Sequence, residues 1–85
     1  MKKIWVLIKT DINAYGGHDT QFEIYASKEA AIKNLETYRL KFYRMVESDR
    51  SRAFWSASDT DTEFQCTVYD HRYKYRVVED VLREE

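Results

Sequence analysis

The chain has one cysteine and two histidines, the side chains best suited to nucleophilic or acid–base chemistry. Cys66 stands five residues before His71, and Asp70 is next to that histidine, so a thiol, an imidazole and a carboxylate occur in one short segment. Alternation of polar and apolar residues places Cys66 on the buried side of a predicted strand, whereas His71 falls in a predicted turn. Reactive cysteines are exposed and structural ones are buried. We therefore interpret Cys66 as an inert core residue and expect no enzymatic activity.

Metal and phosphate sites also lack their usual patterns. Spaced carboxylate and amide groups occur twice, at Asp11, Asn13 and Asp19 and at Asp59, Asp61 and Glu63. Calcium loops need a longer run with a turn glycine and a terminal glutamate, which neither stretch has. A single cysteine excludes a cysteine-based zinc site, and Gly16-Gly17 lacks the third glycine and the Lys-Ser/Thr pair of a phosphate-binding loop. We expect no bound metal and no cofactor.

Aromatic side chains are unusually numerous, with seven Tyr, four Phe and two Trp in 85 residues. A domain of this size buries roughly 60–65% of the surface that its unfolded chain exposes. Each large aromatic side chain takes about 150–250 Å² of that buried area. Several of them should therefore stay partly exposed, or be covered by a second copy of the chain or by another partner.

The overall composition bounds the class of protein. With 44% hydrophobic residues and a formal net charge of -1, the chain does not have the composition of a disordered protein. No apolar run approaches the roughly 20 residues of a membrane-spanning helix, and Ile4–Ile8 is shorter than the roughly 7–15-residue core of a signal peptide. We expect one compact cytoplasmic domain over residues 1–85, with no membrane segment.

Two segments in the first third of the chain predict a β-hairpin. Residues Lys3–Asp11 are rich in β-branched and aromatic side chains and carry apolar groups on both faces, which is typical of a central strand. Residues Gln21–Ala26 alternate, and we expect Phe22 and Ile24 to point into the core and Tyr25 to point away from it. A long polar loop that contains both glycines joins the two strands.

A long amphipathic helix follows the hairpin. Ser27 is a good N-cap, and Glu29 lies in the first turn, where it complements the helix dipole. Apolar side chains then recur at alternating spacings of four and three residues, at Ala31, Leu35, Tyr38, Phe42 and Met45. The pattern fades through residues 47–52.

The second half of the chain predicts a linker and two more strands. Residues 53–62 form the linker, and Glu63–Tyr69 is a strand whose inward residues are Phe64, Cys66 and Val68. After a turn at residues 70–72, Tyr73–Val78 is the last strand, and residues 79–85 either continue it or form a short helix. The order ββαββ predicts an α+β fold, a four-stranded, mostly antiparallel sheet with one helix on one face.

The first half of the chain resembles small uncharacterised domains of bacteria and their phages. The resemblance rests on residues 3–8 (KIWVLI), residues 22–27 (FEIYAS) and residues 28–31 (KEAA), with a glycine-bearing turn between the first two. It implies an αβ sandwich and a phage or mobile-element setting. It implies no catalytic residues.

These features favour a non-enzymatic protein-binding domain. Trp, Tyr and Arg are enriched at interface hot spots, and we expect the sheet face away from the helix to carry Trp5, Leu7, Tyr25 and Tyr69, together with either Tyr73 and Tyr75 or Lys74 and Arg76. The predicted binding residues are Trp5, Tyr25 and Tyr69 on the sheet and Arg50, Arg52, Phe54 and Trp55 in the linker region. Phe54-Trp55 has the alternative of capping the core. The partner is a second copy in a homodimer or another protein, and the phage-like resemblance adds an inhibitor or adaptor that binds a host defence or regulatory protein.

A single-stranded nucleic-acid-binding protein is the alternative. Aromatic side chains on an open sheet face stack bases in some such proteins, with Arg and Lys holding phosphates. Residues 28–52 carry a local excess of basic groups, which favours this function. The balance of 14 basic and 15 acidic residues in the whole chain does not.

Overall fold

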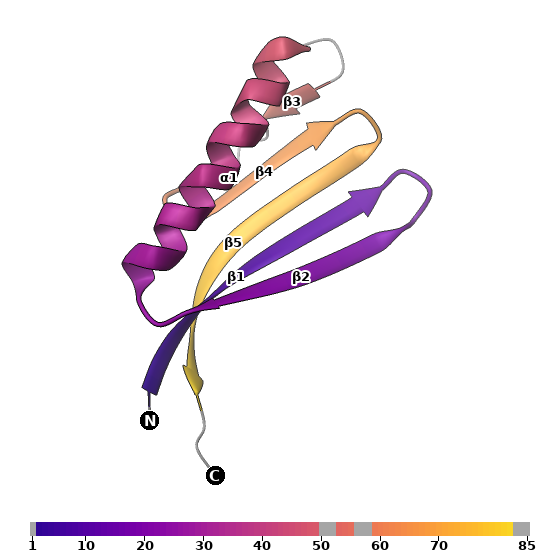
Figure 1. Cartoon of the computed structure of the whole chain (residues 1–85). Helices are drawn as coiled ribbons and strands as arrows, with labels where there is room; N and C mark the ends of the chain where they lie inside the picture. Colours follow the sequence, from indigo (N-terminus) through magenta and orange to yellow (C-terminus); the bar gives the residue numbers. More distant parts are fainter. Residues whose placement is uncertain (1, 50–52, 56–58, 83–85) are drawn as a thin grey trace.

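The computed structural model describes residues 2–49, 53–55 and 59–82 and consists of one antiparallel sheet with one helix across it (Figure 1). Its elements are β1 (Lys2–Asn13), β2 (His18–Tyr25), α1 (Lys28–Ser48), β3 (Ala53–Trp55), β4 (Glu63–Val68) and β5 (His71–Leu82). The strand order across the five-stranded sheet is β2-β1-β5-β4-β3. The α+β fold, the helix and the four expected strands are confirmed, and the short strand β3 is added to them.

The helix begins and ends where its sequence signals lie. Ser27 has an extended backbone with φ -134°, and its side chain accepts a hydrogen bond from the Ala30 N–H at 3.2 Å. This bond satisfies one of the N–H groups that a helix start leaves unpaired. The buried residues of α1 are Ala31, Leu35 and Phe42, which lie on one side of the helix. The side of α1 that faces the sheet is therefore the apolar stripe that the sequence predicts.

The two longest strands lie at the centre of the sheet. β1 and β5 have 12 residues each and pair antiparallel over their whole length, from Lys2 opposite Leu82 to Asn13 opposite His71. The stretch after Val78 therefore continues the strand as far as Leu82, and residues 83–85 lie outside the described residues. Figure 1 shows that this part of β5 and the start of β1 form a two-stranded ribbon that extends past the helix.

The turns are tighter than the sequence predicts. The expected long loop after β1 is a short turn in which the Asn13 side chain accepts hydrogen bonds from the Tyr15 and Gly17 N–H groups, both at 2.9 Å. Gly16 has φ +85°, a conformation that glycine adopts without steric cost. In the β4–β5 turn Tyr69 takes the corresponding left-handed conformation with φ 55°. The expected turn at residues 70–72 starts earlier, because His71 is already in β5.

Three residues of the expected linker form the edge strand β3. Their backbones pair with β4, with Phe54 opposite Thr67 and Trp55 opposite Cys66. Ala53 is buried, and the Trp55 ring stacks on Phe64 with a centroid distance of 5.5 Å. These non-local contacts explain why a segment without its own alternating pattern becomes a strand.

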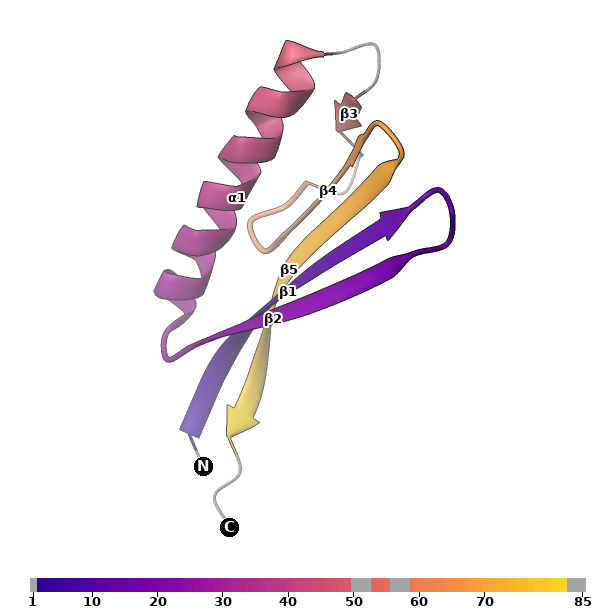
Figure 2. The same cartoon turned by 45° about the vertical axis from the view of Figure 1, so that its right-hand side comes forward.

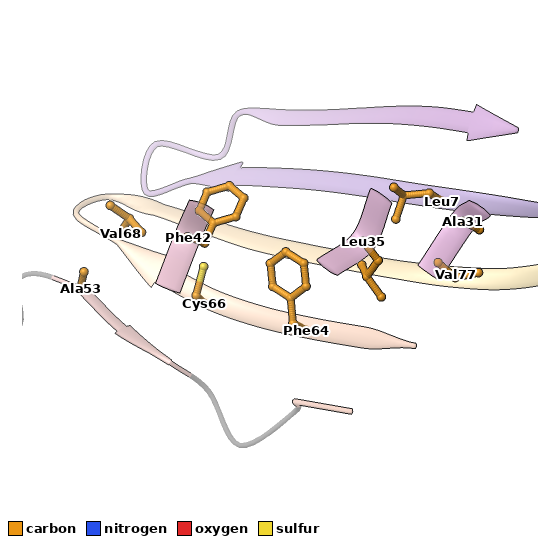
Figure 3. Packing of buried hydrophobic residues seen from close by; sticks show 9 residues of the cluster. All are labelled: Leu7, Ala31, Leu35, Phe42, Ala53, Phe64, Cys66, Val68 and Val77. Atoms are coloured by element: carbon orange, nitrogen blue, oxygen red, sulfur yellow. The ribbon is translucent and has the colours of Figure 1, made fainter. Parts of the chain in front are cut away.

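The hydrophobic core fills the space between α1 and the sheet. Figure 3 shows the nine buried side chains that form it, which are Leu7, Ala31, Leu35, Phe42, Ala53, Phe64, Cys66, Val68 and Val77. The rings of Phe42 and Phe64 lie 5.8 Å apart, centroid to centroid, and join the helix to β4. The expected inward direction of Phe64, Cys66 and Val68 is confirmed.

The expected direction of the β1–β2 hairpin is wrong. Leu7 is fully buried beneath the helix, and Trp5 and Tyr25 pack against the same core. Phe22 and Ile24, which were expected in the core, are 63% and 67% exposed. The apolar residues on both faces of β1 make either orientation compatible with its sequence, and a rotation of the hairpin exchanges the two faces of both strands.

Candidate protein-binding surface

One face of the sheet carries no helix. Figures 1 and 2 show α1 on a single side of the five strands. Because side chains alternate along a strand, the opposite face takes the even-numbered residues of β1, β2 and β5 and the odd-numbered residues of β4. We call this face the open face.

An apolar patch occupies one end of the open face. Its members lie on the three neighbouring strands β2, β1 and β5 and are Ile4, Val6, Ile8, Phe22, Ile24 and Val78. Val6 lies between Ile24 on one side and Val78 on the other, and Ile8 is directly opposite Phe22. The members on the central strands are half-buried by their neighbours, and the two on the edge strand β2 are the most exposed.

A basic row follows the apolar patch along β5. Arg72, Lys74 and Arg76 occupy successive positions of the open face, and Arg72 and Arg76 are exposed. Lys74 lies 3.5 Å from Glu63 on β4, an ion pair in which both side chains are partly exposed. The open face therefore combines an aliphatic region with a row of cationic groups. Of the two alternatives for the last strand, Lys74 and Arg76 lie on this face, whereas Tyr73 and Tyr75 pack against the core.

The predicted sheet anchors lie elsewhere. Trp5 and Tyr25 are cross-strand neighbours on the helix side of the sheet, so their expected place on the open face is wrong. Tyr69 lies in the β4–β5 turn, where its side chain is 53% exposed and its hydroxyl donates to Asp49 at 3.0 Å. The three residues therefore do not form one surface.

The predicted linker residues are only partly described. Trp55 is half-buried in β3, between the rings of Phe64 and Tyr43, with its face on Phe64. This packing matches the alternative in which the aromatic pair caps the core. Arg50 and Arg52 lie outside the described residues, and so does the side chain of Phe54. Their expected binding role stays a prediction.

Tyr25 belongs instead to a polar cluster beneath the start of the helix. Its hydroxyl donates to Glu23 at 2.8 Å, and the Tyr38 hydroxyl donates to the other oxygen of the same carboxylate at 2.8 Å. The Lys9 ammonium completes the cluster at 3.0 Å from Glu23 and also donates to Tyr38 at 3.4 Å. Lys9 has only 15% of its side chain exposed and Glu23 has 29%, so water screens this pair weakly.

The cluster shifts the pKa values of its members. Burial of Glu23 disfavours the carboxylate, but the hydrogen bonds from Tyr25, Lys9 and Tyr38 outweigh burial and hold the pKa of Glu23 below its usual value. Burial likewise opposes the charge of Lys9, yet its hydrogen bonds to Glu23 and Tyr38 raise the pKa of the ammonium. Burial and the bond to Glu23 raise the pKa of Tyr25 to about 12. The cluster is therefore a charged anchor between β1, β2 and α1.

The residues considered for chemistry are held in structural contacts. Cys66 is fully buried, and burial raises the pKa of its thiol to about 12. His71 Nδ1 lies 2.8 Å from Asp11 Oδ1 on the neighbouring strand, and its ring stacks on Tyr73. Among the described residues, no three His, Cys, Asp or Glu side chains gather to hold a metal ion. No helix in the described ranges has the length and apolar character of a membrane span.

The apolar patch is what the sequence analysis missed. Its signal was present, because Ile4, Val6 and Ile8 share one face of β1, and Phe22 and Ile24 continue that face on β2. Those residues were assigned to the core because they are more apolar than the opposite face. Comparisons of the chain with protein-family models, curated proteins and solved structures find no match.

Proposed function

We propose that the protein is a non-enzymatic protein-binding domain that uses the open face of its sheet. The single observation that carries this proposal is the exposure of Phe22 and Ile24, 63% and 67%, at the border of a continuous apolar patch. Burying a side chain of this kind contributes about 1.5–3 kcal/mol. Exposed apolar patches rimmed by polar groups mark interaction sites more often than plain surface.

The remaining contacts support binding rather than catalysis. The thiol of Cys66 is buried in the core, and His71 is engaged with Asp11. The polar cluster of Lys9 and Glu23 lies against the helix and satisfies its charges internally. The phage setting and the host partner that the resemblance implies stay predictions.

Affinity capture with face variants tests the proposal. The immobilised chain should retain a protein from the cells in which it is made or from their host, and Ile8→Ser combined with Ile24→Ser should abolish retention. The matched control is Leu40→Ser, which removes an apolar side chain that is 52% exposed on α1. Circular dichroism establishes that all variants are folded. Equal capture by the face variant and the control would contradict the proposal.

The basic row supports nucleic-acid binding as a second candidate. Arg72, Lys74 and Arg76 are spaced along one strand of the open face, as phosphate-binding side chains are. Fluorescence anisotropy with a labelled single-stranded oligonucleotide separates the two candidates. Phosphate contacts weaken steeply with salt, so binding that is lost between 50 and 200 mM salt and in Arg72→Gln/Arg76→Gln identifies the nucleic-acid function. Binding to a protein through apolar contacts depends little on salt.

A further inference from the structure

The outer edge of the sheet at β2 is unprotected. β2 has eight residues, and its pairing with β1 runs without interruption from Trp5 opposite Tyr25 to Ile12 opposite His18. Proteins usually protect edge strands with proline, lysine, a bulge or a very short length. β2 has no proline, no lysine and no bulge, whereas the strand at the opposite edge, β3, has three residues.

The free backbone groups of β2 can be identified from the turn. The Asn13 N–H donates to the Gly17 carbonyl at 3.0 Å, so these two residues form a hydrogen-bonded pair. In an antiparallel ladder such pairs alternate with non-hydrogen-bonded ones. The residues of β2 whose backbone bonds point to β1 are therefore Asp19, Gln21, Glu23 and Tyr25. Those whose N–H and C=O groups point outward are His18, Thr20, Phe22 and Ile24.

We infer that β2 pairs antiparallel with β2 of a second copy of this chain, with Phe22 of both copies at the two-fold axis. Two five-stranded sheets then become one continuous sheet. The outward backbone groups supply the hydrogen bonds, and Phe22, which is 63% exposed in the single chain, packs against its own copy. This inference goes beyond the proposed function, since it uses the edge of the sheet and leaves most of the open face free.

Charge selects this register. With Phe22 opposite Phe22 of the second copy, Gln21 faces Glu23 of the second copy, and an amide N–H₂ can donate to that carboxylate. A slip by one pair in one direction places Glu23 opposite Glu23 of the second copy. A slip in the other direction places Glu23 opposite Asp19 of the second copy. Like charges directly opposite one another are unfavourable, so one register avoids both repulsions.

The same pairing argues for a second copy as the occupant. A two-fold interface must be complementary to itself. β2 meets this condition, because its negative group at Glu23 meets the neutral amide of Gln21, and Thr20 meets the exposed Ile24. The two apolar patches then adjoin across the axis, on the same face of the joined sheet.

Sedimentation of the whole chain over a range of concentrations tests the pairing. We expect a dimer for the wild type and a monomer for Thr20→Pro, which removes an outward N–H and leaves the bonds to β1 intact. Thr20→Val is the matched control, since it keeps the N–H and a β-branched side chain, and it should remain dimeric. A wild-type monomer at every concentration, or a folded Thr20→Pro dimer, would overturn the inference.

Thiol cross-linking tests the register and does not depend on a proline variant. Opposed Cα atoms in a hydrogen-bonded pair are about 5.5 Å apart, so Phe22→Cys should form a covalent dimer with a short bifunctional thiol reagent. Ile24→Cys should not, because the two cysteines would be four residues out of register, roughly 13 Å along the strand. Wild type reports any reaction of the buried Cys66. Equal cross-linking of the two variants, or none in Phe22→Cys, would contradict the register.

The two proposals fail separately. Thr20→Pro leaves the side chains of Ile8 and Ile24 in place, so a monomeric Thr20→Pro protein should still capture a partner through the open face. Loss of the dimer with retained capture refutes only the edge pairing. A dimer whose capture is unaffected by Ile8→Ser/Ile24→Ser refutes only the proposed function.

Discussion

At the scale of single residues, Glu23 has the largest structural role among the charged groups. Its carboxylate accepts three hydrogen bonds, from Lys9, Tyr25 and Tyr38, which come from both strands of the hairpin and from α1. A partly buried carboxylate with this many donors stabilises the fold through its charge. Removal of the charge leaves the Lys9 ammonium without its ion-pair partner in a region that water reaches poorly.

We therefore expect Glu23→Gln to lower the free energy of unfolding by about 1–3 kcal/mol at pH 7, the usual effect of losing hydrogen bonds to a charged group. Because the pKa of Glu23 is lowered on folding, the contribution of its charge is present above the ordinary pKa of 4.5 and is lost as the pH falls through the folded value. Urea unfolding of both proteins at pH 7 and pH 3 measures this. The difference should shrink at pH 3.

Glu36→Gln is the control for that experiment. Glu36 also forms an ion pair, with Arg39 at 3.0 Å, but its side chain is 52% exposed. Exposed pairs contribute about 0–1 kcal/mol, so this variant should change stability by less than the Glu23 variant. Equal effects of the two substitutions would show that the Lys9–Glu23 cluster is no more stabilising than a surface ion pair.

At the scale of elements, the helix is the part of the fold that depends most on burial of one stripe. Leu35 is fully buried, whereas Leu40, five residues later in α1, is 52% exposed. Leu35→Ala should lower the free energy of unfolding by about 2–5 kcal/mol, because it removes buried methyl groups and leaves a cavity. Leu40→Ala, the same substitution in the same helix, should change it by about 0.5 kcal/mol or less. Thermal unfolding monitored by circular dichroism compares the two, and similar losses would mean that α1 does not pack on the sheet through Leu35.

How far the sequence predicts the fold differs between these elements. The helix could be placed because Ser27 caps it and its apolar period is local. The strand containing Phe64, Cys66 and Val68 was oriented correctly because one of its faces is apolar and the other is polar. β1 has apolar side chains on both faces, so only its pairing with β5, which sets Leu7 opposite Val77, determines which face the helix covers.

The candidate surface depends on that same choice. Once Leu7 faces the helix, Trp5 and Tyr25 follow it into the core, and Phe22 and Ile24 move to the open face. β3 could not be found locally either, because its strand conformation comes from pairing with β4 and from the stacking of Trp55 on Phe64. The sequence therefore predicts the elements well and the exposed surface poorly.

At the scale of the whole molecule, the protein is thin and elongated. Its dimensions are 49 × 26 × 17 Å, and its radius of gyration is 14.2 Å. A compact chain of this length would have a radius of about 12 Å. The difference reflects a two-layer structure, one helix on one sheet, with the ends of β1 and β5 extending beyond the helix (Figure 2). A second layer on the open face, from a partner, would give the sheet cover on both sides.

The buried acidic protons of the core make the stability of the whole molecule sensitive to alkaline pH. Burial raises the pKa of Tyr25, Tyr75 and Cys66 to about 12 each, whereas the ordinary values are 10.0 for tyrosine and 9.0 for cysteine. Above pH 9–10 these groups lose protons in the unfolded chain first, which favours unfolding. Their contribution is thus complete at neutral pH, declines from about pH 9 and levels off once the folded groups also ionise.

Urea unfolding midpoints between pH 7 and pH 11 measure this decline. We expect a plateau up to about pH 9 and a progressive fall above it. In Tyr75→Phe, which keeps the ring that contacts Phe42 and Phe64 but has no phenol to ionise, the fall should be shallower than in wild type. Tyr15→Phe is the control, because Tyr15 is 90% exposed in the β1–β2 turn and removing its hydroxyl should leave the wild-type curve unchanged. If Tyr75→Phe and wild type fell in parallel to pH 11, the buried phenol of Tyr75 would not be what couples folding to pH.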